Sequence, residues 1–147
     1  VGRVTPFETR GHVALAGTFG YELDVTQIPE EDRKMIPAQV EMYHKYHDLV
    51  REATTIASLP IGRIISTTAG LWLPGIRVRW LVTYVQVLGV PNPITRKIYL
   101  DGFDEKATYR LEGTEEVYTG SMLMKAGFLI RGLHGDFKSK LYHFVRV

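Results

Sequence analysis

The chain has 147 residues, of which 45% are hydrophobic and 23% charged, and its formal net charge is +2. These proportions are those of a folded globular protein and exclude a disordered or fibrous chain, and so small a net charge gives no reason to expect a nucleic-acid partner. The absence of cysteine excludes disulfides, cysteine-ligated zinc and a thiol nucleophile.

The first ten residues carry no targeting signal, because Arg3, Glu8 and Arg10 interrupt them. Further along, arginines break the apolar stretches well short of the roughly 20 residues that a membrane span needs. We therefore expect a cytoplasmic protein with no membrane partner. Because the chain opens on Val1 rather than on methionine, we also expect it to be a piece of a longer protein.

Residues 1–52 carry helix signals with one strand-like interruption. Thr5 as N-cap, Pro6 at the first helical position and Glu8 three residues after the cap predict the start of a first helix. The segment Phe19–Asp24 then alternates aromatic, small and polar side chains. This alternation predicts a short strand, or a strand leading into a loop.

A second helix is expected to open at Pro29, where a missing N–H costs nothing and three carboxylates follow. Pro37 removes one internal hydrogen bond, which predicts a kink or a restart near Ile36. Apolar residues recur beyond it at three- and four-residue spacing, at Ile36, Val40, Tyr43, Tyr46 or His47, and Val50. This spacing is typical of a helix with one buried stripe.

Residues 80–147 change to the period of β-strands. Short alternating runs end at turn residues about every 10 positions, over 80–88, 97–100, 107–111, 116–118 and 141–147. This pattern predicts an antiparallel β-sandwich. The fold class is therefore α/β followed by all-β.

No complete active site is visible in the motifs. His44 and His47 lie one helical turn apart and could share a metal ion, but no third ligand follows them, so we predict no metal site and no cofactor. Paired acids at 30–32 and 115–116 suit helix ends and hairpin edges, and spacing alone does not make them an acid–base pair. Tyrosines of the predicted strands could stack on sugars, although aromatic strand residues more often form core; they are Tyr109, Tyr118 and Tyr142.

Several stretches resemble the bacterial α-galactosidases of glycoside hydrolase family 36. Residues 5–24, TPFETRGHVALAGTFGYELD, closely resemble a signature stretch of that family, and 39–46 resemble the helix that follows it. Further stretches are similar to the C-terminal domain of the family, namely 82–93, 109–113, 117–120, 135–137 and 141–143. The resemblance covers roughly residues 1–52 and 80–147.

The resemblance implies a fold and a mechanism. Residues 1–52 would be the end of a catalytic (β/α)8 barrel, with Phe19–Asp24 as its last strand, and 53–147 a C-terminal antiparallel β domain. Family members cleave terminal α-linked galactose with retention, using two Asp residues that both precede the stretch that begins here. No catalytic residue is therefore assigned to this chain. Only the strand exit at Phe19, Gly20 and Tyr21 is expected to reach the substrate pocket, because barrel sites form at the C-terminal ends of strands.

The implied parent protein would hydrolyse α-galactosides of the raffinose and melibiose type, without a cofactor and as a homo-oligomer. The fragment alone would be inactive. One alternative is a non-catalytic module whose β domain binds carbohydrate or assembles subunits. Another is a relative that transfers galactose between sugars, because acceptor choice depends on loops rather than on the fold.

Residues 53–79 do not resemble the family, and no Asp or Glu occurs from Ala53 to Leu100. Residues 53–57 can be written with the codons GCG ACT ACT ATC GC, a spelling chosen among the synonymous ones. Read one base earlier after a G, this spelling gives Gly-Asp-Tyr-Tyr-Arg, the type of stretch expected there. A similar shift at 75–79 gives Asp-Lys-Ser-Glu. We therefore hypothesise a one-base loss near Glu52 that is compensated near Arg79. If the printed residues are encoded, we expect a β domain short of strand pairs, with exposed edges.

Overall fold

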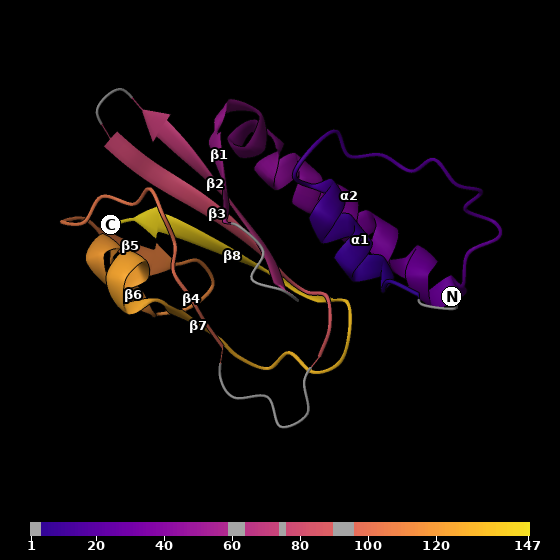
Figure 1. The fold of residues 1–147 in the computed structure, drawn as a ribbon. Coiled ribbons are helices and arrows are strands. Elements are labelled where there is room, and N and C mark those ends of the chain that lie inside the picture. The colour runs from indigo at the N-terminus through magenta and orange to yellow at the C-terminus, as the bar shows by residue number, and fades with distance from the viewer. Residues whose placement is uncertain (1–3, 59–63, 74–75, 90–95) are drawn as a thin grey trace.

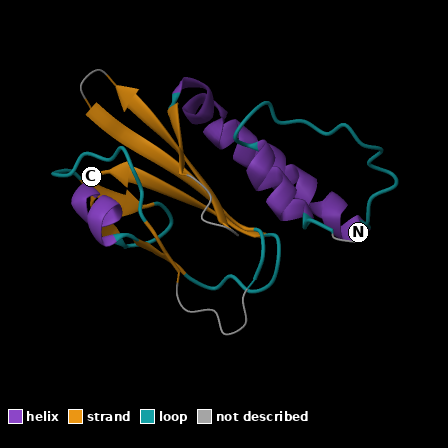
Figure 2. Cartoon of the chain, viewed as in Figure 1, coloured by secondary structure: helices purple, strands orange, loops and turns teal. Residues whose placement is uncertain are grey.

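The computed structural model describes residues 4–58, 64–73, 76–89 and 96–147, with the side chains of 54–77 left out. Two helices are followed by a β region that also contains one π-helix, η1 (Figures 1 and 2). The elements are α1 (Phe7–Ala14), α2 (Glu30–Glu52), β1 (Thr54–Ser58), β2 (Ile64–Leu73), β3 (Ile76–Gln86), β4 (Arg96–Ile98), β5 (Thr108–Leu111), β6 (Val117–Thr119), η1 (Met122–Ala126), β7 (Phe128–Ile130) and β8 (Lys138–Arg146).

Both helices begin directly after a proline. Pro6 and Pro29 take the N-cap positions, and neither helix has a side-chain cap. The N-cap expected at Thr5 is therefore wrong by one residue. Pro6 has an extended backbone, with ψ of 144°, and the helix begins only after it. α2 runs without a break through Pro37, so the helix does not restart there. Packing of its buried stripe outweighs the one hydrogen bond that Pro37 removes.

The strand expected at Phe19–Asp24 is not formed. Residues 18–22 have neither helix nor turn, and a bend follows at Leu23. A strand needs a neighbour for its backbone hydrogen bonds, and no strand of the described residues pairs with this segment. Figure 1 shows it as part of a long arc on the outer side of the helix pair, with the sheet on the other side.

A six-stranded sheet of order β1-β2-β3-β8-β5-β6 forms the body of the β region, and β4 pairs with β7 in a second sheet. All of these pairings are antiparallel. The strands expected from residue 80 onward are all present, whereas the short β7 and η1 were missed. The loop before β8 has positive φ at Gly132, Gly135 and Phe137, which is typical of tight turns.

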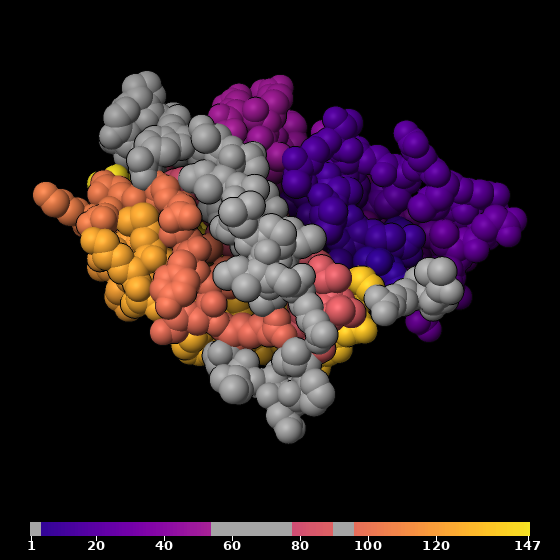
Figure 3. All heavy atoms as spheres, viewed as in Figure 1, coloured from indigo at the N-terminus to yellow at the C-terminus, as the bar shows by residue number. Residues whose placement is uncertain are grey.

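The two faces of the large sheet are covered differently. β3 shows this best, because residues 80–86 are all buried although their side chains alternate between the faces. One face meets β4, β7 and η1 in a cluster that contains Trp80, Leu123 and Phe144. The other face receives the helices through a smaller cluster built on Leu15, Leu49 and Leu81. Figure 3 shows the helical residues and the β residues as adjoining parts of one surface.

Segment 53–79 contributes strands to the sheet. β1 pairs with β2 and β2 with β3, so the expectation of a β domain short of strand pairs is wrong for the backbone. Short runs of Thr, Ile and other β-formers are compatible with strands whatever their origin. The hypothesis of a shifted reading frame concerns the side chains, which lie outside the described ones. Among the described helices, none is long and apolar enough to cross a membrane.

Candidate functional site

The predicted substrate-lining residues lie against the helices in an aromatic cluster. The Phe19 ring stacks on Tyr43 of α2 at 5.4 Å between centroids, and the Tyr21 ring stacks on Phe7 of α1 at 6.0 Å. Phe19 and Tyr21 also meet edge to face at 5.4 Å. Gly20 between them is exposed. The two rings therefore hold the segment to the helices, and the lining role of the three residues stays a prediction.

The Gln39 side chain holds this cluster through two hydrogen bonds. The Tyr21 hydroxyl donates to Gln39 Oε1 at 2.7 Å, and Gln39 Nε2 donates to the carbonyl of Phe7 at 2.9 Å. Gln39 is only 7% exposed, so both hydrogen bonds satisfy an amide that would otherwise be costly to bury. A Cβ at Gly11 would lie 2.6 Å from Gln39 Cδ, which explains the glycine in the middle of α1. Sequence reasoning missed this glutamine, because a lone polar residue on a helix gives no signal.

A cavity of about 180 Å³ lies between α1 and this segment. Its lining combines the aromatic cluster with one amide, one cation and one carboxylate, and comprises Phe7, Arg10, Gly11, Ala14, Phe19, Gly20, Tyr21, Glu22, Leu23 and Gln39. The guanidinium of Arg10 forms an ion pair with the Asp32 carboxylate at 3.5 Å. The cavity has no nucleophile paired with a base.

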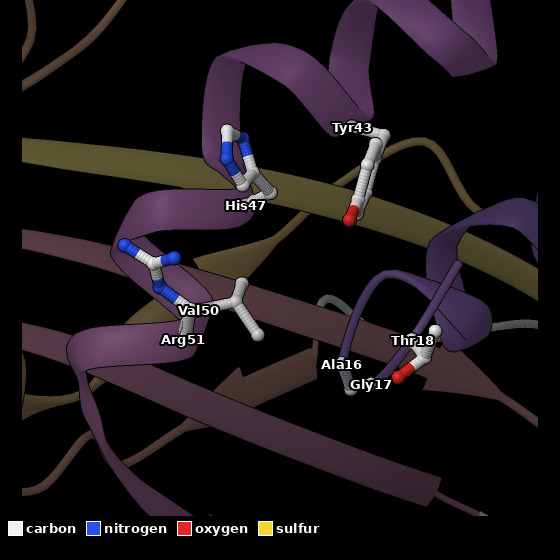
Figure 4. Close-up of a pocket in the computed structure, with 7 residues that line it drawn as sticks. All are labelled: Ala16, Gly17, Thr18, Tyr43, His47, Val50 and Arg51. Carbon is white, nitrogen blue, oxygen red and sulfur yellow. The ribbon is translucent and has the colours of Figure 1, made fainter.

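A second cavity, of about 300 Å³, lies between the C-terminal half of α2 and the loop after α1 (Figure 4). Figure 4 shows Tyr43 on the helix and Thr18 on the loop on opposite sides of it. Two of its side chains share one carboxylate, because Asp48 Oδ1 lies 3.0 Å from His47 Nε2 and 3.4 Å from Arg51 Nη2. The Asp48 carboxylate offsets the charge of Arg51, so the cavity has little attraction for an anion.

Glu112 forms a charged cluster between α2 and the sheet. Its Oε2 accepts a hydrogen bond from Lys45 Nζ at 2.7 Å and lies 3.0 Å from His143 Nδ1 and 3.4 Å from the Tyr46 hydroxyl. Hydrogen bonds from Lys45 and His143 lower the pKa of Glu112 to about 2. Arg79 Nε donates to His143 Nε2 at 3.2 Å, so His143 accepts there and is neutral. Burial accordingly lowers the pKa of His143.

A buried hydrogen-bond chain joins α1 to the start of β8. The Thr9 hydroxyl donates to the Phe137 carbonyl at 2.7 Å, and Ser139 Oγ donates to Thr9 Oγ1 at 2.9 Å. His12 Nδ1 lies 2.7 Å from Ser139 Oγ and must be the donor, because the serine proton is already used. Burial lowers the pKa of His12, although the nearby Glu8 carboxylate opposes this. We interpret this serine–histidine pair as structural rather than catalytic, because Ser139 is buried and already donates its hydroxyl proton to Thr9.

The remaining candidates have structural positions. His47 Nδ1 lies 3.2 Å from the carbonyl of His44, and no group of three or more metal-ligating side chains occurs among the described residues. Tyr109 is fully buried, and Tyr118 and Tyr142 pack against the same core. The ring of Tyr109 is therefore part of the core, whereas Tyr118 and Tyr142 are partly buried and pack on Phe128 and other core rings.

Two family models match the chain. The model described as melibiase matches residues 1–53, and the model described as glycosyl hydrolase family 36 C-terminal domain matches residues 77–144. The gap between the two matches falls on the segment that departed from the family in the sequence analysis. The two matches also separate the helical region from the β region.

Curated relatives match nearly the whole chain. Alpha-galactosidase Mel36A of Lactobacillus acidophilus is 37% identical over 145 residues, which make up 97% of this chain and 19% of that protein. Alpha-galactosidase AgaA of Geobacillus stearothermophilus is 35% identical over 147 residues, again 97% of this chain and 19% of that protein. The chain thus spans about a fifth of the length of these relatives.

Solved structures agree in fold. A variant of AgaA from Geobacillus stearothermophilus in complex with raffinose matches with a TM-score of 0.89 and 34% identity, over 100% of this chain and 20% of that one. The galactosidase domain of AgaSK matches with a TM-score of 0.90 and 30% identity, over the same shares. Both helices and the β region are included in these matches.

Proposed function

The chain belongs to glycoside hydrolase family 36, and we propose that the protein of which it is a part is a retaining α-galactosidase. The observation that carries the proposal is the joint match of the helical region and the β region to α-galactosidases of known structure, over the full chain. The chain itself would be a non-catalytic piece of that enzyme.

We place residues 1–52 at the end of a (β/α)8 barrel and 53–147 in a C-terminal antiparallel β domain. The order of α1, an extended segment and α2 suits a barrel, in which each strand is followed by a helix on the outer ring. Segment 18–24 would then be the last strand, whose pairing partners lie elsewhere in the parent. This explains why an extended stretch with two anchored rings forms no strand in the described chain.

The chemistry would be carried by residues upstream of Val1. Retention needs one carboxylate that attacks the anomeric carbon and one that protonates the leaving oxygen, about 5–5.5 Å apart. The acids of α1 and α2 have other partners or lie on the helix surface, such as Asp32 beside Arg10 and Asp48 beside His47. The contribution of this chain would be to close the barrel and to hold its last strand and helix.

The proposed substrates are oligosaccharides with terminal α-galactose. AgaA has been solved in complexes with raffinose and with stachyose. We extend the same substrate class to the parent protein, and we propose that it acts in the cytoplasm as a homo-oligomer. Product analysis with sucrose as acceptor separates a hydrolase from a galactosyl transferase.

Trapping of the glycosyl-enzyme tests the proposal. The complete protein would be incubated with an activated fluorinated α-galactoside that forms a long-lived covalent intermediate, and the labelled peptide would be identified by mass spectrometry. We expect one labelled Asp that lies outside residues 1–147. A labelled residue within 1–147 would contradict the assignment, and a complete protein without α-galactosidase activity would contradict the function.

A further inference from the structure

The two ring nitrogens of the buried His143 have partners of opposite character. Nε2 accepts a hydrogen bond from Arg79 Nε of β3 at 3.2 Å, and Nδ1 lies 3.0 Å from Glu112 Oε2. A neutral imidazole has one donor and one acceptor, so its proton is on Nδ1, toward the carboxylate. The arrangement therefore requires His143 to be neutral.

Glu112 connects this ring to α2. Its Oε2 also accepts a hydrogen bond from Lys45 Nζ at 2.7 Å, and its backbone N–H donates to the carbonyl of His143 at 2.8 Å. From α2, the ring of Tyr46 lies edge to face against the imidazole at 5.2 Å between centroids. One carboxylate therefore links the helix to the histidine of β8.

The groups around the ring make a second proton unfavourable. Arg79 of β3 and Lys45 of α2 are cations, and Glu112, in the turn after β5, is the carboxylate between them. Burial raises the pKa of Tyr46, so its hydroxyl stays neutral. A proton on Nε2 would place two donors 3.2 Å apart and would leave three cations with one carboxylate. Burial lowers the pKa of His143, and the two cations lower it further, whereas Glu112 opposes them.

The contact of α1 with β8 responds differently to a proton. His12 Nδ1 donates to Ser139 Oγ at 2.7 Å, and the Glu8 carboxylate of the same helix is near it. Protonation of the other ring nitrogen of His12 leaves this donor in place. Acid therefore keeps the hydrogen bond between α1 and β8 but removes the acceptor that His143 presents.

We propose that His143, Glu112 and Arg79 form an acid-sensitive switch that fastens α2 to the sheet. When Nε2 takes a proton from water, its hydrogen bond with Arg79 is lost, and the charged ring is best solvated when Tyr46 and α2 move off it. The aromatic and aliphatic core on the other face of the sheet stays closed. Because the folded state favours the neutral ring, the stabilisation is fully present above pH 6.5 and is lost as the pH falls below it. The switch lies within this chain and does not depend on the proposed function.

Hydrogen exchange of the complete protein, followed by mass spectrometry and corrected for the intrinsic effect of pH, tests the switch. Between pH 6.5 and pH 4.5, where Glu112 begins to protonate, we expect protection at 39–52 of α2 to fall at least about threefold. Protection at 122–130, which holds η1 and β7 on the other face, should stay within about twofold. Equal loss in both regions, or no loss in α2, would overturn the proposal. No substrate is used, so these outcomes are independent of α-galactosidase activity.

Two substitutions should change this pH dependence in opposite directions. Arg79→Gln removes a cation from Nε2 and makes the proton less costly, so the loss of protection in α2 should shrink to less than about half. Glu112→Gln removes the carboxylate that offsets the imidazolium, so the loss should grow at least about twofold. Lys138→Gln removes an exposed cation of β8 and is the matched control, expected to behave as the wild type. An unchanged pH profile in Arg79→Gln, or shifts of the same sign in both variants, overturns the proposal; if one variant does not fold, the direction of the other decides.

Discussion

The two faces of the six-stranded sheet are held in different ways. The face toward β4, β7 and η1 buries a large cluster of aromatic and aliphatic side chains that includes Trp80, Leu123 and Phe144. Among the described residues, the face toward α1 and α2 buries Leu15, Leu49 and Leu81. Partly buried apolar neighbours, such as Tyr43 and Leu141, pack against them, and polar contacts add to this smaller cluster. The β region therefore has a larger core of its own, while the helices are held to the sheet by a smaller apolar cluster together with hydrogen bonds.

This difference follows from what each part must do. Apolar burial is non-directional and gives a stable core, whereas hydrogen bonds such as Ser139 to Thr9 fix one relative orientation of two elements. Helices at the end of a proposed barrel need that fixed orientation, because they carry the segment at Phe19–Tyr21. Substitutions on one face at a time test this difference between the two faces of the sheet.

The largest effect is expected in the β core. Phe144 is fully buried and its ring contacts Phe103, Tyr118 and Phe128. Phe144→Ala should lower the free energy of unfolding by about 3–5 kcal/mol, from lost burial and a new cavity. Urea unfolding followed by near-ultraviolet circular dichroism measures this, with the exposed Val147→Ala as control. A loss below about 1 kcal/mol would show that this core is not the main source of stability.

Removal of apolar contact on the helical face should cost less. Leu49 is 1% exposed but packs in the smaller cluster. Leu49→Ala should cost about 2 kcal/mol, the lower end for buried leucine, because the helix can shift to fill the space. Hydrogen exchange should speed up in α2 and stay unchanged in β8. Equal acceleration in both elements would mean that the two regions unfold together.

The hydrogen-bond chain between α1 and β8 should contribute less again. Ser139→Ala leaves His12 and Thr9 without their buried partner and should cost about 1–2 kcal/mol. The nearby exposed Lys138→Ala is the control. The same urea measurement applies, and a neutral Ser139→Ala would show that water replaces the hydroxyl at no cost.

The smallest effect is expected from pH, through Glu112. Its pKa is lowered from 4.5 to about 2, so the charged form is favoured in the folded state. Its stabilisation is present above pH 4.5 and is lost as the pH falls toward 2. Because the side chain is 41% exposed, solvent screening reduces the contribution to about 1 kcal/mol. Glu112→Gln should remove this part of the pH dependence in unfolding experiments between those limits, and an unchanged pH profile would refute it.

The sequence predicted the β region well and the helical region in outline. Every strand from residue 80 onward except the three-residue β7 carried its own signal, because alternation and turn residues are local. The segment at Phe19–Asp24 carried the same signal but formed no strand, since a strand also needs a partner that local sequence does not supply. Contacts such as Gln39 with Tyr21 and Ser139 with Thr9 join residues far apart in the chain, so no spacing rule could have predicted them.

For segment 53–79, the shifted reading frame stays a prediction. The melibiase match ends at residue 53, and the match to the C-terminal domain begins at residue 77. We expect resequencing of the gene to show one missing base near Glu52 and a compensating change near Arg79, with acidic residues restored between them. A gene sequence that encodes residues 53–79 as they stand here would refute the shifted frame.

Activity of the complete protein tests the central claim most directly. The full coding region would be expressed intact and truncated just before Val1, and both products would be assayed on an aryl α-galactoside. We predict an active complete protein and an inactive truncated one, because the barrel would lack its closing strand and helix. A truncated protein as active as the intact one, or an intact protein without activity, would contradict the account.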